Sequence, residues 1–149
     1  MQFSTIDKND IHLIKPLWEK LNQIHLNDST HFKEHYKQFS FDERCNHFSE
    51  IHPEDLHIKI VSDNDRVVGY CISSYTKGTG EIDSLFVDES HRNLGLGKAL
   101  FKNALSWFEL KCCKKVTVSV AEGHESVLPF YRQFDFFPRS ITLQHKKSK

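Results

Sequence analysis

The chain has 149 residues, of which 38% are hydrophobic and 27% are charged. This length and apolar content predict a single globular domain over residues 1–149 and exclude a disordered polymer. The twenty basic and twenty acidic residues cancel, so no overall field favours nucleic acid or an anionic membrane. We find neither a secretion signal nor an apolar run of membrane-spanning length in the sequence, and therefore expect a cytoplasmic location.

The first third of the chain is predicted to be helical. Apolar residues recur every three or four positions over residues 10–26, which is typical of an amphipathic helix. Pro16 is expected to kink this helix or to mark a start within it. A second helix is predicted after Ser40, inside a polar segment, residues 29–50, whose boundaries the pattern does not define.

The middle of the chain changes to the period of a β-strand. Three segments rich in β-branched and aromatic residues are separated by turn-forming residues: HIKIV (57–61), RVVGYCISSY (66–75) and GEIDSLFV (80–87). They predict a three-stranded antiparallel meander. Beyond it we expect a helix from Lys98, a buried strand over 115–121, a short helix over 125–134 and a last strand over 139–144. This order predicts an α+β fold, a mixed α/β sandwich.

Cysteine and histidine spacing gives no metal or disulfide pattern. The four cysteines lack paired spacing, so we interpret them as reduced thiols. The ten histidines are scattered, and none forms a His-Glu-x-x-His or joins a Cys-x-x-Cys pair. We therefore expect no metal cofactor.

The segment HRNLGLGKAL, residues 91–100, is predicted to hold phosphate. Its glycines leave amide groups uncovered, and a helix that follows adds its own unpaired N–H groups and positive dipole end. A Walker A loop is excluded, because Lys98 is followed by Ala99 and Arg92 stands where the first glycine belongs. The dinucleotide fingerprint is also excluded, because Leu100 replaces its third glycine and the preceding strands form a meander.

Two stretches together resemble a known family. LFVDESHRNLGLGKAL (85–100) resembles motif A of the GNAT N-acetyltransferase superfamily, which has a strand ending in Val, an acidic turn, Arg/Gln-x-x-Gly-x-Gly/Ala and a helix. VTVSVAEGHESVLPFYRQFDFF (116–137) resembles its later motif, Asn-x-x-Ala-x-x-Phe-Tyr-x-x-x-Gly-Phe. This chain departs from the later motif at His124, Val127 and Asp135, where the family usually has Asn, Ala and Gly. Asp tolerates a left-handed helix end better than most residues.

The resemblance implies an acetyl-CoA site in a mostly antiparallel sheet with splayed central strands and flanking helices. Acetyl-CoA would be the acetyl donor, with its pantetheine arm bonded to the strand backbone at Leu85, Phe86 and Val87. The pyrophosphate would lie on the loop, and His124 would add a further contact. The loop residues expected to bind the cofactor are Arg92, Asn93, Leu94, Gly95, Leu96, Gly97 and Lys98.

Acetyl transfer to an amine needs a base, a group that polarises the thioester carbonyl and an acid for the departing thiolate. Glu81 lies eleven residues before Arg92, at the offset where histone-acetylating members of the family carry a glutamate base, and it would act directly or through a water. Asp83 shares its strand face by period two and is the alternative base, or a binder of the acceptor's charge. Tyr131 aligns with the tyrosine that protonates the coenzyme A thiolate in many members, and the backbone N–H near Val87 would polarise the carbonyl.

The acceptor is expected to be a primary amine of a small molecule or peptide. In the family the N-terminal region forms much of the acceptor pocket, which here includes Trp18, His25, His31 and His35, although such residues more often face solvent or the core. The sequence does not identify the acceptor and leaves a homodimer open. The alternative function is a non-catalytic sensor that binds coenzyme A, against which Glu81 and Tyr131 weigh.

Overall fold

The computed structural model describes residues 1–147, so Ser148 and Lys149, the end of the predicted domain, lie outside the described residues. The described residues form two compact units. The first contains Met1–Leu21 and Ser40–Ser119, and the second contains Asn22–Phe39 and the chain from Val120 onward. One boundary, between Leu21 and Asn22, falls within a helix, and each unit is described separately below.

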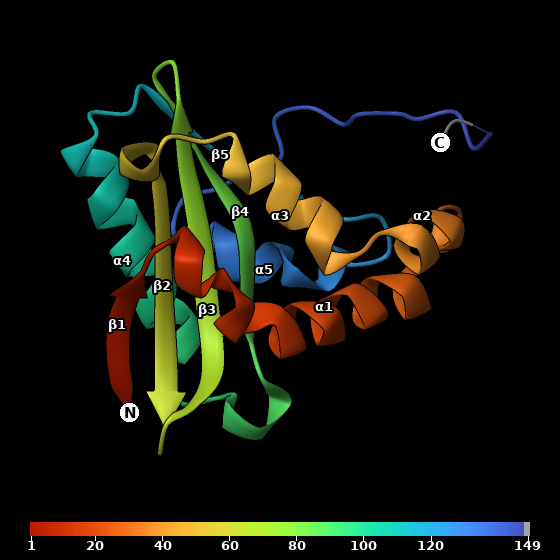
Figure 1. Cartoon of the computed structure of the whole chain (residues 1–149). Helices are drawn as coiled ribbons and strands as arrows, with labels where there is room; N and C mark the ends of the chain where they lie inside the picture. Colours follow the sequence, from red (N-terminus) through yellow and green to blue (C-terminus); the bar gives the residue numbers. More distant parts are fainter. Residues whose placement is uncertain (148–149) are drawn as a thin grey trace. The chain divides into compact units, whose positions relative to one another are not determined.

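The first unit is built on a five-stranded sheet in the order β1-β2-β3-β4-β5. The strands are β1 (Gln2–Ile6), β2 (Leu56–Asp63), β3 (Arg66–Thr76), β4 (Thr79–Val87) and β5 (Lys115–Val118). Neighbours from β1 to β4 run antiparallel, and β5 runs parallel to β4 (Figure 1). The predicted meander and the mostly antiparallel sheet are thereby confirmed.

Tight turns set the register of the meander. Asn64 and Asp65 join β2 to β3 with φ angles of 50° and 67°, and Lys77 and Gly78 join β3 to β4 with φ angles of 47° and 86°. Two consecutive residues with positive φ match the right-handed twist of the flanking strands, and Asn, Asp and Gly adopt this conformation at the lowest cost.

Helices and short 3₁₀ segments complete the first unit. These are η1 (Lys8–Ile14), the first turns of α1 (Lys15–Asp28), α3 (Phe41–Ser49), η2 (Pro53–Asp55), η3 (Glu89–His91) and α4 (Leu96–Leu110). Pro16 is the second residue of α1, which confirms that it marks a helix start. The Ser40 hydroxyl accepts the N–H of Glu43 at 3.1 Å and so begins the second predicted helix. Helix α4 packs against β2, β3 and β4 (Figure 1) and buries Leu100, Phe101 and Phe108.

The second unit holds the end of α1, α2 (Lys33–Gln38), η4 (Glu125–Val127) and α5 (Leu128–Arg132). After α5, Asp135 has a φ of 64°. Its N–H donates to the Arg132 carbonyl at 3.0 Å, and the N–H of Phe136 donates to the Tyr131 carbonyl at 3.1 Å. These two bonds make a Schellman motif. The expectation that Asp135 accepts a left-handed helix end is confirmed.

Two strand predictions were wrong. Residues 139–144 form no strand, and Ile141 and Leu143 are 83% and 90% exposed. Alternating apolar residues give a segment strand character, but a strand also requires a partner ladder. Strand β5 is shorter than the predicted 115–121 and alternates between exposed and half-exposed residues, so it is not a buried strand. Conversely, β1 and α2 were not predicted.

Candidate functional site

Strands β4 and β5 pair only over half of β4. Thr79–Ile82 faces Lys115–Val118, and within the described residues β5 pairs with nothing from Asp83 to Val87. The part of β4 that contains Leu85, Phe86 and Val87 therefore has β3 as a neighbour on one side and an open edge on the other. This is the splayed arrangement expected from the sequence. An open edge presents backbone groups to which an extended ligand can bond.

A β-bulge lies where the two strands separate. Ile72 of β3 pairs with Ser84, whereas the next residue, Ser73, pairs with Ile82, so Asp83 is the extra residue on β4. A bulge redirects side chains locally. The Tyr70 hydroxyl is 2.8 Å from the Ser84 hydroxyl, which shows that Ser84 shares the face of Tyr70.

Arg44 of α3 reaches the bulge. Its guanidinium donates to the Asp83 backbone carbonyl at 2.9 Å and lies 3.9 Å from the Asp83 carboxylate. The same guanidinium lies over the Phe48 ring, 4.7 Å from its centroid. Arg44 therefore connects helix α3 to the site where β4 leaves β5.

Asp83 has an unusual electrostatic environment. Its side chain is 2% exposed, and one carboxylate oxygen, Oδ2, has no hydrogen-bond partner among the described residues. Burial, with a smaller contribution from the Glu81 carboxylate, raises the pKa of Asp83 to about 6 against the opposing effects of Ser74 and Arg44. A carboxyl group that changes charge close to neutral pH is typical of proton-transfer sites.

Glu81 is the more accessible of the two strand carboxylates. It is half-exposed and pairs across the sheet with Ser74, the residue whose hydroxyl also bonds Asp83. Glu81 and Asp83 therefore lie on one face, as the sequence predicted. The exposure of Glu81 lets it contact a substrate, whereas the Asp83 side chain acts on its surroundings from a buried position.

The predicted phosphate loop is exposed and strongly curved. Residues 92–95 are exposed, and Asn93 and Gly95 have φ angles of 64° and 77°. Gly95 is the N-cap of α4, and the first bond inside the helix runs from the Ala99 N–H to the Gly95 carbonyl at 3.0 Å. The N–H groups from Gly95 to Lys98 thus have no partner within the helix. Together with the dipole of the fifteen-residue helix, they form a site suited to an anion.

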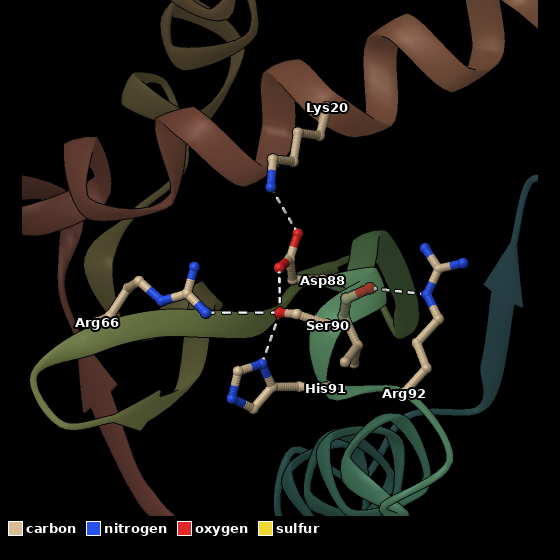
Figure 2. Close-up of polar contacts among 7 residues, drawn as sticks. Lys20, Arg66, Asp88, Ser90, His91 and Arg92 are labelled. Atoms are coloured by element: carbon tan, nitrogen blue, oxygen red, sulfur yellow. Dashed lines mark hydrogen bonds and ion pairs between the residues drawn. The ribbon is translucent and has the colours of Figure 1, made fainter.

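Arg92 connects the loop to the end of β4. Its Nε donates to the Val87 carbonyl at 3.1 Å (Figure 2). Its guanidinium lies 5.4 Å from the centroid of the Phe86 ring. The structure therefore brings the predicted cofactor residues of β4 and of the loop together, with a permanent positive charge between them.

Tyr131 and His124 belong to the second unit. Tyr131 is half-buried on α5, and its ring centroid lies 5.3 Å from that of Phe130 and 6.4 Å from that of Phe136. The His124 ring contacts His25 edge-on at 4.9 Å, and its Nδ1 is 3.9 Å from the Asp28 carboxylate. Burial, and secondly His124, lower the pKa of His25 to about 4.

The sequence suggested Trp18, His31 and His35 as acceptor-pocket residues. Trp18 is 6% exposed and packs edge-on against Phe41 with centroids 5.5 Å apart, so it is a core residue. His31 and His35 are exposed.

The four cysteines, Cys45, Cys71, Cys112 and Cys113, are free thiols. Among residues 1–147 no group of three or more His, Cys, Asp or Glu side chains could hold a metal ion, and no helix there is both long and apolar enough to cross a membrane.

Sequence reasoning missed Arg44 and Asp88. Arg44 is 39 residues from Asp83 along the chain, and no local pattern marks it. Asp88 was noted only as part of an acidic turn, yet it is 3% exposed and bonded to Lys20 of α1. The sequence does not show that the acid after a strand is buried, because its partner Lys20 lies 68 residues away along the chain.

The bulged strand, its open edge and the unpaired N–H groups at the start of α4 are together suited to an extended, phosphate-bearing ligand. The model of the acetyltransferase (GNAT) family matches residues 18–136, and the chain belongs to this family.

An uncharacterised N-acetyltransferase of Methanocaldococcus jannaschii is 28% identical over 95 residues, which are 63% of this chain and 60% of that protein. A glucosamine 6-phosphate N-acetyltransferase of Trypanosoma brucei brucei is 37% identical over 65 residues, or 42% of each chain. The matches thus span less than two thirds of either relative. A solved aminoglycoside N-acetyltransferase in complex with CoA has the same fold, with a TM-score of 0.68 at 13% identity over 99% of this chain and 100% of that chain.

Proposed function

We propose that this protein is an N-acetyltransferase that moves an acetyl group from acetyl-CoA to a primary amine. The observation that carries the proposal is the helix start at Gly95, where four N–H groups lack helical partners directly beyond a strand with an open edge. The family model spans parts of both compact units, which supports treating residues 1–149 as one acetyltransferase domain.

In the proposal acetyl-CoA binds along β4 and the loop. The pantetheine amides bond to the backbone of Leu85–Val87, in the way that an added strand pairs with an open edge. The pyrophosphate lies on the N–H groups from Asn93 to Lys98, and Arg92 contributes its charge. His124 is proposed as a further cofactor contact, on the family resemblance alone.

The proposed reaction is direct transfer. Glu81 takes a proton from the acceptor ammonium, directly or through a water, and its exposure supports this role. The neutral amine attacks the thioester carbonyl while the N–H near Val87 stabilises the developing oxyanion. A C–N bond forms, the C–S bond breaks, and Tyr131 gives its phenolic proton to the departing thiolate. Asp83 is the alternative base, supported by its raised pKa and opposed by its burial.

The proposed acceptor is a primary amine of a small molecule or a peptide. Two similar proteins are named as acetyltransferases of glucosamine 6-phosphate and of aminoglycosides, and both of these compounds carry amino groups. These names support an amine acceptor, and the acid pair Glu81 and Asp83 would favour one that arrives as a cation.

Calorimetry with acetyl-CoA and a thiol-release assay over a panel of amines test this proposal. Gly97→Pro removes one N–H from the anion site at the second residue of α4, a position where this chain carries proline in α1 and α5. The variant is therefore expected to fold and to bind acetyl-CoA far more weakly. Unchanged affinity would refute the loop assignment, and binding without thiol release for any amine would favour a non-catalytic sensor.

A further inference from the structure

A buried carboxylate lies between the end of β4 and the phosphate loop. The Asp88 carboxylate accepts hydrogen bonds from the Lys20 ammonium of α1 at 2.7 Å and from the Ser90 hydroxyl at 2.5 Å (Figure 2). The backbone N–H of Asp88 donates to the Val68 carbonyl at 2.8 Å. Lys20, followed by Ser90, lowers the pKa of Asp88 to about 2. Asp88 is therefore a charged carboxylate, both of whose oxygens accept hydrogen bonds, and it lies four residues before Arg92.

Hydrogen bonds continue from Ser90 to the hairpin of β2 and β3. The Ser90 hydroxyl is 2.7 Å from His91 Nδ1 and 3.5 Å from the Arg66 guanidinium, and His91 Nε2 is 2.8 Å from the Asp63 carboxylate. The connected set Lys20, Asp88, Ser90, His91 and Asp63 is called the loop anchor below. It joins α1, the turn after β4 and the end of β2.

The proton count fixes the direction of these bonds. A carboxylate at Asp88 can only accept, so the single hydroxyl proton of Ser90 is donated to it. The Ser90 oxygen must then accept from His91 Nδ1, and the Asp63 carboxylate must accept from Nε2. In this arrangement both ring nitrogens of His91 face acceptors. The arrangement of Ser90, His91 and Asp63 is consequently not a nucleophile triad, since no ring nitrogen is available to take the serine proton.

We propose that Asp88 is a positioning residue for cofactor binding, which holds the loop of residues 92–98 in its curved shape through the loop anchor. The inference rests on the proposed function, in that the loop is taken to bind the acetyl-CoA pyrophosphate. Residues 92–95 of the loop are exposed and Gly95 has nothing within 4 Å of a Cβ built on it, so side-chain packing does not fix the shape of this part. The bonds from Asp88 to α1 and from His91 to β2 supply a constraint on its shape.

Simple electrostatics makes the opposite prediction. Removing a negative charge beside a pyrophosphate site should strengthen cofactor binding by Coulomb's law. If Asp88 positions the loop, Asp88→Asn should instead weaken binding, because the loop must then be ordered by the ligand at an entropic cost. Glu89 is the matched control, since it is an exposed carboxylate of the same turn.

Calorimetry with acetyl-CoA and amide hydrogen exchange test the inference on the full chain. For Asp88→Asn we expect affinity to fall on the order of tenfold, the effect of one lost charge-assisted hydrogen bond, and faster exchange in residues 92–98. The KM for acetyl-CoA should rise while the KM for the amine holds. Glu89→Gln should leave exchange unchanged and affinity equal or higher.

Ser90→Ala keeps the ion pair between Asp88 and Lys20 and replaces Asp88→Asn as the test if that variant does not fold. We expect it to weaken acetyl-CoA affinity and to speed exchange in residues 92–98, both by less than Asp88→Asn. Equal or tighter binding by the anchor variants, or unchanged exchange in the loop, overturns the inference. A wild-type protein that binds no acetyl-CoA would overturn the proposed function instead, while the exchange comparison would still decide whether Asp88 orders the loop.

Discussion

Replacing Asp83 by asparagine should change how the stability of the protein depends on pH. The pKa of Asp83 is raised from 3.8 to about 6, chiefly by burial. Between these two pH values the folded state binds more protons than the unfolded state, so the wild-type protein loses stability as the pH rises through this window. A difference of about two pKa units at 1.36 kcal/mol each gives a loss of about 3 kcal/mol, complete above pH 6.

Asparagine has the shape of aspartate and no charge to bury. Relative to the wild type, Asp83→Asn should therefore gain about 3 kcal/mol between pH 4 and pH 7, on top of a pH-independent offset from replacing the protonated carboxyl by an amide. For a chain of this length the gain corresponds to a relative shift in Tm of roughly 6–12 °C.

Thermal unfolding of both proteins at several pH values from 4 to 7.5 measures this difference. Asp65→Asn is the control, because Asp65 is exposed in a hairpin turn at a φ of 67° that asparagine also accepts. Parallel stability curves for wild type and Asp83→Asn would refute the reasoning, since they would mean that Asp83 is already paired or hydrated in the folded protein.

Three further substitutions test the site and the packing around it. Glu81→Gln should lower kcat by roughly 10² to 10⁴ at constant acetyl-CoA affinity, and normal turnover would transfer the role of base to Asp83 or to a water. Tyr131→Phe should slow thiol release at a nearly unchanged Tm; a loss of about 1 kcal/mol of stability with full activity would instead identify a structural hydroxyl. Gly80→Ala would place a Cβ 2.4 Å from the Phe108 ring and should cost about 1–3 kcal/mol in urea unfolding, so a neutral effect would show that α4 shifts freely.

The sequence predicted the elements whose signals are local. The meander follows from the two-residue period of three segments and the turn residues between them, and the start of α1 follows from Pro16. The left-handed backbone at Gly95 and Asp135 could likewise be expected from residue type and position. The predicted strand over 139–144 was wrong for the complementary reason, because its pattern carries no information about a partner strand.

Some residues of the candidate site could be predicted from local sequence, and others could not. The loop from Arg92 to Lys98 and the acids on β4 were visible in the sequence, since chain order alone places them at the end of one strand and the start of one helix. Tyr131 and His124 came only from the family resemblance, and their roles remain predictions.

By itself the sequence determined the fold class, the order of the central strands and helices, and the loop suited to a phosphate, because all of these depend on residues close together in the chain. Only the tertiary structure decided that β4 bulges at Asp83, that Arg44 reaches this bulge, and that Lys20 and Asp63 hold the turn before the loop. Burial and ion pairing arise from packing between distant segments, so the charge state of Asp83 and the anchoring of Asp88 could not be derived before those segments were brought together.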